Sequence, residues 1–276
     1  MLKHRFLTTL VLIPIVLLAV GFLPMPWFSV LVGVVIAWAA WEWAALSGII
    51  SHYGRGLYVL LIAAALWAAY YLSVFWILIA SLVVWIWIAV AIFCYTFGFA
   101  PLGFQYSIIK IISGFFTLIP CWLAITALRE DIGGPRWLLF GFVVVWAVDT
   151  GAYIAGQWWG KHTLITRVSP KKTWEGLWGG IISALLMAAV IGFIFRLPFD
   201  RIFLFCLLTL ITVVFAIVGD LFESMLKRQA GVKDSGQLLP GHGGILDRID
   251  SVVAALPVFV LCSLLMTYYY PSVNTT

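Results

Sequence analysis

Long apolar stretches alternate with short polar segments along almost the whole chain. Their lengths are close to the roughly 20 residues that an α-helix needs to cross a bilayer, and their composition is typical of membrane-spanning helices. The predicted helices span residues 6–23, 27–47, 57–71, 74–95, 108–128, 137–156, 177–195, 202–222 and 251–270. The pattern therefore predicts an all-α integral membrane protein, a polytopic bundle of about nine transmembrane helices.

Two parts of the chain depart from this simple pattern. The third and fourth helices form one apolar block, which we divide near Leu72 and Ser73 because it is too long for a single crossing; about eight or ten helices is the alternative. The first helix follows Lys3 and Arg5, as in a signal peptide, but no small-residue cleavage site comes after it. We therefore expect a retained helix.

The composition supports a membrane location. Hydrophobic residues make up 64% of the chain and charged residues 10%, whereas soluble domains are about 25% charged. No charged residue occurs between Gly56 and Ile109, which a bilayer accommodates and a globular core does not. The net charge of +5 then reflects basic loops beside a membrane, and no nucleic-acid partner is expected.

The basic residues predict how the chain is oriented. In a bundle of about nine helices, most of them fall on one side, which the positive-inside tendency assigns to the cytoplasm. These residues are Lys3, Arg5, Arg55, Lys161, Arg167, Lys171, Lys172, Lys227, Arg228, Lys233 and Arg248. We expect the bacterial cytoplasmic (inner) membrane, with the active site facing the cytoplasm and the carboxyl terminus outside.

Acidic residues divide the chain into two regions. The first half has only Glu42, Glu130 and Asp131. The second half has Asp149, Glu175, Asp220, Glu223, Asp234, Asp247 and Asp250. We therefore expect residues 1–130 to form a scaffold with lipid-facing and dimer surfaces, and residues 131–276 to form a catalytic region with cytoplasmic loops 157–176 and 223–250.

Four carboxylates are candidate metal ligands: Asp149, Asp220, Asp247 and Asp250. A carboxylate at membrane depth is costly unless it is paired or bound to a cation, and oxygen ligands favour Mg²⁺ over Zn²⁺. Structural alternatives remain open for each. Asp220 could reach water at a helix end, Asp247 and Asp250 could cap the last helix, and Lys110 could neutralise Asp149.

Basic and small residues beside these carboxylates suit a polyanionic substrate, because Lys and Arg bind phosphate and glycine lets the backbone approach an anion. Candidates for phosphate binding are Ser169, Lys171, Lys172, Ser224, Gly243 and Gly244. The catalytic candidates are Asp220, Asp247, Lys227, Arg228, Lys233, Asp234, His242, Arg248 and Asp250. As alternatives, Lys171 and Lys172 attract anionic lipid headgroups, Thr173 and Glu175 cap a helix, and His242 is a turn residue.

The run from Ser224 to Asp250 is similar to the signature of the phosphatidate cytidylyltransferase (CDP-diacylglycerol synthase) family. The matching positions are Ser224, Lys227-Arg228, Lys233-Asp234, Pro240, His242-Gly243-Gly244, Asp247-Arg248 and Asp250. The segments DTGAYIAG, SPKKTWEG and GDLFES resemble further family segments. The resemblance implies a polytopic, homodimeric nucleotidyltransferase of phospholipid biosynthesis that uses CTP, phosphatidic acid and Mg²⁺, with Asp220 and Asp247 as leading metal ligands.

The implied reaction fits this set of residues. A phosphate oxygen of phosphatidic acid would attack the α-phosphorus of CTP and release pyrophosphate. Because the second pKa of a phosphate monoester is about 6, no strong base is needed, and cations must offset the repulsion between two polyanions. The alternatives are a CTP-dependent polyprenol or lipid-alcohol kinase and a membrane transporter, although no inverted repeat is visible.

Overall fold

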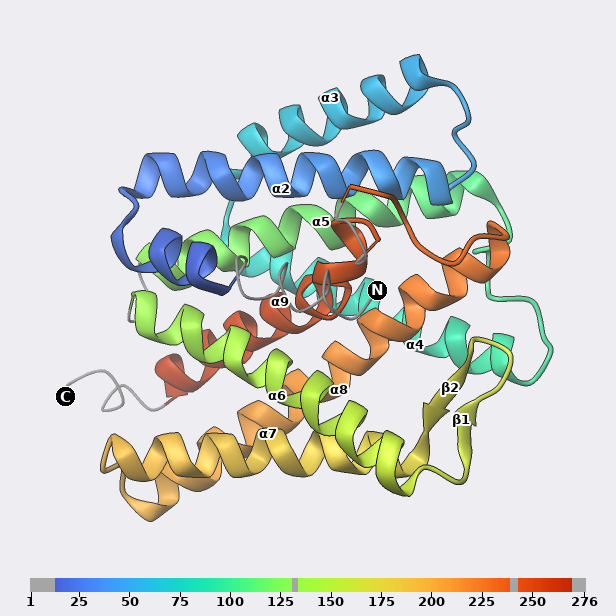
Figure 1. Ribbon diagram of the computed structural model, residues 1–276. Helices are drawn as coiled ribbons and strands as arrows, with labels where there is room; N and C mark the ends of the chain where they lie inside the picture. Colours follow the sequence, from blue (N-terminus) through green and yellow to red (C-terminus); the bar gives the residue numbers. More distant parts are fainter. Residues whose placement is uncertain (1–12, 131–133, 239–242, 270–276) are drawn as a thin grey trace.

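The computed structural model describes residues 13–130, 134–238 and 243–269. Nine helices lie within these residues, and Figure 1 shows them packed side by side in one bundle. A short apolar helix, Ile13–Phe22, comes first. It is followed by α2 (Met25–Leu46), α3 (His52–Ala69), α4 (Val74–Thr96), α5 (Ser107–Glu130), α6 (Pro135–Trp159), β1 (Thr163–Ile165), β2 (Ser169–Thr173), α7 (Trp174–Ile194), α8 (Phe199–Gln229) and α9 (Leu246–Tyr269).

The helices confirm an integral membrane protein of nearly all-α fold. Seven of them, α2 and α4 to α9, are long and apolar enough to cross a bilayer, compared with about nine expected from the sequence. The described part of the first helix, Ile13–Phe22, is shorter than the members of that set, and α3, with 18 residues, is not part of it. The apolar block of the third and fourth predicted helices is divided between Ala69 and Val74, as expected.

The predicted loop 223–250 is wrong in its boundaries. Helix α8 runs for 31 residues and ends at Gln229, and α9 begins at Leu246. Ser224, Lys227 and Arg228 therefore lie on a helix. Polar residues interrupt the hydrophobic pattern at this end of α8, so the pattern predicts that the helix ends too early. Ion pairs and tertiary contacts keep these polar residues helical.

The predicted loop 157–176 contains a β-hairpin. Strands β1 and β2 are antiparallel, with Thr163 opposite Thr173 and Ile165 opposite Ser169. Thr173 also caps α7, since its hydroxyl accepts a hydrogen bond from the Gly176 amide at 3.1 Å. The tip of the hairpin contacts α4, where the Arg167 guanidinium lies 4.7 Å from the Tyr95 ring centroid.

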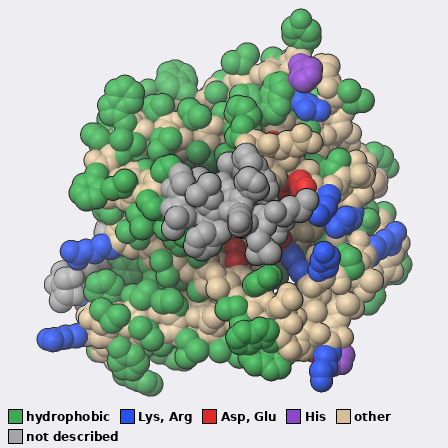
Figure 2. Space-filling model, viewed as in Figure 1, with side chains coloured by type: hydrophobic (Ala, Val, Ile, Leu, Met, Phe, Trp, Pro, Cys, Tyr) green, Lys and Arg blue, Asp and Glu red, His purple; other side chains and the backbone are tan. Residues whose placement is uncertain are grey.

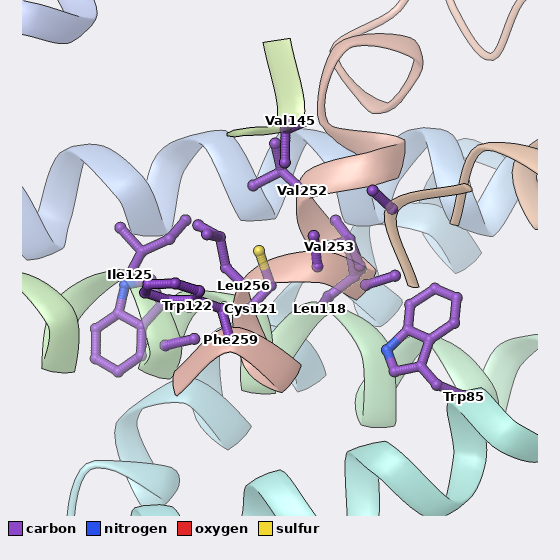
Figure 3. Close-up of a cluster of buried hydrophobic side chains, with 14 of the residues drawn as sticks. Trp85, Leu118, Cys121, Trp122, Ile125, Val145, Val252, Val253, Leu256 and Phe259 are labelled. Atoms are coloured by element: carbon purple, nitrogen blue, oxygen red, sulfur yellow. The ribbon is translucent and has the colours of Figure 1, made fainter. Parts of the chain in front are cut away.

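Helix α9 occupies the middle of the bundle (Figure 1), and residues 252–261 are all buried. A helix that is apolar on every side is stable only when protein or lipid surrounds it. Figure 3 shows Val252, Val253, Leu256 and Phe259 of α9 beside side chains of α5 and α6. The α5 and α6 residues labelled there are Leu118, Cys121, Trp122, Ile125 and Val145. The charged first turn of α9 therefore lies at the end of a fixed, buried helix.

Helices α6 and α7 approach each other closely through small residues. A side chain at Gly151 would collide with Ser183, and one at Gly179 would collide with Ala155. The Ser183 hydroxyl donates to the Ala147 carbonyl across the interface at 2.6 Å. Such small residues let helix backbones approach within a membrane, and here they hold Asp149 of α6 beside the hairpin that precedes α7.

Candidate active site

A cavity of about 570 Å³ opens between α6, the hairpin, α7, α8 and α9. Five predicted site residues line it: Asp149, Ser169, Lys171, Lys172 and Asp220. Other lining residues include Tyr153, Gln157, Thr173, Gly176 and Ser251. Segments that are far apart in the sequence thus contribute acidic, basic and hydroxyl groups to one space.

Three carboxylates and one lysine form what we call the cavity cluster: Asp149, Asp220, Asp250 and Lys172. The three carboxylates interact electrostatically with one another and with Lys172, and Lys172 forms an ion pair with Asp220. Arg248 also acts on Asp149. Lys172 and Arg248, rather than Lys110, are therefore the basic groups that offset the charge of Asp149.

Gly219 brings two members of this cluster together. A side chain at Gly219 would collide with the Asp250 carbonyl oxygen and contact Ala254. The absence of a Cβ atom therefore lets the backbones of α8 and α9 approach at the level of Asp220 and Asp250. Glycine is required here by close packing within a helix rather than by an unusual backbone conformation.

A second group of polar residues, the loop cluster, comprises Glu42, Glu223, Lys227, Ser235 and Asp247. Lys227 Nζ lies 2.5 Å from Glu223 Oε2 and 2.6 Å from Asp247 Oδ1. Asp220, Glu223 and Lys227 follow one another on one face of α8. Glu223 is buried, and its Oε1 atom has no hydrogen-bond partner among the described residues.

Asp247 organises the segment before α9. Its Oδ2 atom accepts hydrogen bonds from the Ser235 amide at 2.9 Å, the Gly244 amide at 2.8 Å and the Ser235 hydroxyl at 3.0 Å. Its Oδ1 atom accepts from Lys227 at 2.6 Å. Both oxygens of this predicted metal ligand therefore have protein partners. Gly244 precedes α9, so its contact with Asp247 fixes the segment before the helix and does not cap the first helix amides.

The other predicted residues are placed less centrally. Arg228 Nε donates to the Val168 carbonyl at 3.2 Å, which ties α8 to the hairpin. Lys233 and Asp234 are exposed, with Asp234 beside Gly243, and Ser224 does not line the cavity. His242 lies outside the described residues.

Glu42 belongs to the loop cluster and was not predicted there. It lies on α2, is 3% exposed, and accepts hydrogen bonds from Ser235, Ile245 and Leu246. A sequence signal existed, because Glu42 is the single acidic residue of the apolar helix Met25–Leu46, and an acid within a membrane segment is a functional candidate. The region 1–130 therefore supplies part of the polar centre as well as scaffold.

The polar groups gather on one side of the bundle. The carboxyl ends of α6 and α8 lie on the same side as the hairpin (Figure 1). Figure 2 shows most of the visible Lys and Arg side chains on this side, next to recessed acidic side chains, whereas hydrophobic side chains cover much of the remaining face. This distribution suits a membrane protein that handles anionic substrates at one membrane surface.

The chain matches the profile described as "Cytidylyltransferase family" over residues 3–266. It is 38% identical to a phosphatidate cytidylyltransferase of Pseudomonas aeruginosa, over 94% of this chain and 96% of that protein. It is 36% identical to one of Haemophilus influenzae, over 94% of this chain and 97% of that protein. A third relative, from Bacillus subtilis, is 47% identical over 46% of this chain and 47% of its own length. Because the profile and the first two relatives match nearly all of its length, the chain belongs to the cytidylyltransferase family.

Proposed function

We propose that this protein is a phosphatidate cytidylyltransferase, which converts CTP and phosphatidic acid into CDP-diacylglycerol and pyrophosphate. Membership of the family across residues 3–266 carries the proposal. The cavity supports it, because carboxylates and lysines meet there at the ends of membrane-spanning helices. A lipid phosphate at the membrane surface and a soluble nucleotide can both reach such a position.

The reaction requires charge stabilisation more than it requires a strong base. A phosphate oxygen of phosphatidic acid forms the new bond to the α-phosphorus of CTP, and the bond from that phosphorus to the β-phosphate oxygen breaks. The lipid phosphate is already largely ionised near neutral pH. Lys171 and Lys172, which line the cavity, would bind phosphate oxygens and offset the charge that develops on the departing pyrophosphate.

Mg²⁺ is the cation that we propose for the reaction. Among the described residues, no three His, Cys, Asp or Glu side chains form a metal-binding group as they stand. The chemistry of the donors nevertheless fits a hard cation, since the cavity cluster offers three carboxylates and Glu223 Oε1 lacks a partner within the described chain. Asp149, Asp220 and Asp250 would hold the ion, and Asp247 remains a predicted ligand that would have to exchange one of its present hydrogen bonds. When bound, Mg²⁺ would neutralise phosphate charge.

Lys172 would have two roles in the cavity. Its ammonium forms an ion pair with Asp220, so it offsets carboxylate charge in the cavity cluster. Because Lys172 also lines the cavity, it would bind a substrate phosphate there.

The transferred group of CTP provides the direct test. The purified protein is mixed with phosphatidic acid, Mg²⁺ and CTP labelled at either the α- or the γ-phosphate. Cytidylyl transfer moves the α-label into the lipid and releases the γ-label as pyrophosphate. A parallel reaction with a lipid alcohol tests the CTP-dependent kinase, which moves the γ-label into lipid and releases CDP; that result would contradict the proposal.

We also propose that the cavity faces the cytoplasm of a bacterial inner membrane, where CTP is available, and that the protein is a homodimer. The test of orientation is cysteine labelling in intact cells, after replacement of Cys94, Cys121, Cys206 and Cys262. Gln237→Cys is expected to be protected from an impermeant reagent, and Ser272→Cys is expected to react. Cross-linking in native membranes tests the dimer.

A further inference from the structure

The carboxylate of Glu42 connects the first half of the chain to the polar centre. Its Oε1 atom accepts a hydrogen bond from the Ile245 amide at 3.1 Å, and its Oε2 atom accepts from the Leu246 amide at 2.8 Å. These amides lie at the start of α9, which begins at Leu246. A helix leaves its first amides without partners and attracts negative charge there. Glu42 therefore caps α9 from another helix.

The surroundings of Glu42 are shaped to receive a carboxylate. It is 3% exposed, and no Lys, Arg or His of the described residues forms an ion pair with it. A side chain at Gly236 would collide with its Oε1 atom, and one at Gly244 would collide with its Oε2 atom. The loop approaches the Glu42 carboxylate most closely at these two glycines.

Ser235 links Glu42 to Asp247. Its hydroxyl oxygen lies 2.9 Å from Glu42 Oε2 and 3.0 Å from Asp247 Oδ2. A serine hydroxyl carries one proton, so the two carboxylates share a single donor. Since Asp247 also binds Lys227 at 2.6 Å, a continuous polar chain runs from α2 to α8.

We infer that Glu42 is a positioning residue for the reaction: it fixes Ser235 and the start of α9, and through them the orientation of Asp247 and Lys227. This inference rests on the proposed function. Glu42 does not line the cavity, so it acts through these neighbours and not on substrate. The scaffold half would then set the geometry of the residues that carry the reaction.

The first test replaces Glu42 with glutamine, which keeps the size of the side chain and removes its charge. The matched control is Glu130→Gln, since Glu130 is an exposed acid of the same half. We expect hydrogen–deuterium exchange of the Ile245 and Leu246 amides to become faster in Glu42→Gln alone. We also expect kcat/KM to fall roughly tenfold to a hundredfold, as for a lost hydrogen bond to a charged group.

Ser235→Ala provides a second variant that keeps both backbone contacts of Glu42. We expect a loss of about twofold to tenfold in kcat/KM, with the Ile245 and Leu246 amides still protected. Residues in one hydrogen-bond network are not additive, so the double variant should lose little more than Glu42→Gln alone. Losses that multiply would mean independent effects and would overturn the inference. If Glu42→Gln does not fold, Ser235→Ala becomes the test of the inference. Wild-type kcat/KM in Ser235→Ala would then overturn it.

The outcomes also separate this inference from the proposed function. A wild-type protein that forms no CDP-diacylglycerol would overturn the proposed function, and with it the role of Glu42 in the reaction. An active wild-type protein with unchanged kcat/KM in Glu42→Gln would overturn the inference alone. Wild-type amide exchange at Ile245 and Leu246 in that variant would also count against it, because the contact would then not hold the start of α9.

Discussion

The cavity cluster and the loop cluster have similar residue compositions, but within the described residues only the cavity cluster borders an open space. Each places one lysine among several carboxylates from α8 and α9. In the cavity cluster, Asp149, Asp220 and Lys172 line an open space. In the loop cluster, the oxygens of Asp247 and Glu42 already have protein donors. The first cluster therefore borders a space that could admit ligands, whereas the second holds the segment before α9.

The largest expected effect is in the cavity cluster. We expect Asp220→Asn to reduce turnover roughly a thousandfold or more, because charge stabilisation by a metal contributes several kcal/mol, and to require more Mg²⁺ for half-maximal activity. The matched control is Asp200→Asn, at the exposed opposite end of α8. Turnover close to wild type at saturating Mg²⁺ would remove Asp220 from the proposed metal site.

Asp247→Asn tests the loop cluster. We expect a loss of about a hundredfold, since a hydrogen bond to a charged group contributes up to about 3 kcal/mol, in a protein that still folds in detergent. The Mg²⁺ requirement should stay near that of wild type if Asp247 mainly orders the loop. A higher requirement, matching that of Asp220→Asn, would instead make Asp247 a metal ligand and weaken the distinction between the clusters.

Lys172 should matter more than a lysine that only faces an anionic membrane. We expect Lys172→Ala to lower kcat/KM roughly tenfold to a hundredfold, and Lys171→Ala to have a smaller effect, because only Lys172 pairs with Asp220. Lys161→Ala is the control, since Lys161 is exposed and outside the cavity lining. The kinetics are measured with CTP and phosphatidic acid varied separately at two salt concentrations. An effect that salt removes would indicate lipid attraction alone.

The smallest expected effect concerns the helix contact beneath the cavity cluster. Gly219→Ala would place a methyl group against the Asp250 carbonyl, and such overpacking costs about 1–3 kcal/mol. We expect a lower unfolding temperature and a modest loss of activity. Gly56→Ala is the control, because a side chain there meets no neighbour. Equal unfolding temperatures for the two variants would show that α8 and α9 tolerate a wider separation.

Much of this protein could be predicted from its sequence. Hydrophobic runs of membrane-crossing length identified the helices, since each span must satisfy its own backbone hydrogen bonds in lipid. The concentration of charges in the second half identified Asp149, Ser169, Lys171, Lys172 and Asp220, which line one cavity. Both results depend on local composition, which a single sequence contains.

Other features depended on contacts between distant segments. The sequence predicted that α8 would end at residue 222, whereas it continues to Gln229 with Lys227 held between Glu223 and Asp247. Neither hydrophobicity nor spacing shows that two carboxylates from different helices will enclose a lysine. The hairpin was missed for a related reason, because its tip is held by Arg167 against Tyr95, 72 residues away in sequence.

The sequence by itself determined that the chain is a membrane bundle and predicted its chemistry in the second half, because bilayer solvation and charge cost act on each segment separately. Only the tertiary structure decided which carboxylates line the cavity and which bind the segment before α9. That division depends on packing: Gly219 lets α8 and α9 meet, and Gly236 and Gly244 let the loop enclose Glu42. Glu42 lies 193 residues from Ser235 in sequence, so its role follows from the folded arrangement of helices and from no local pattern.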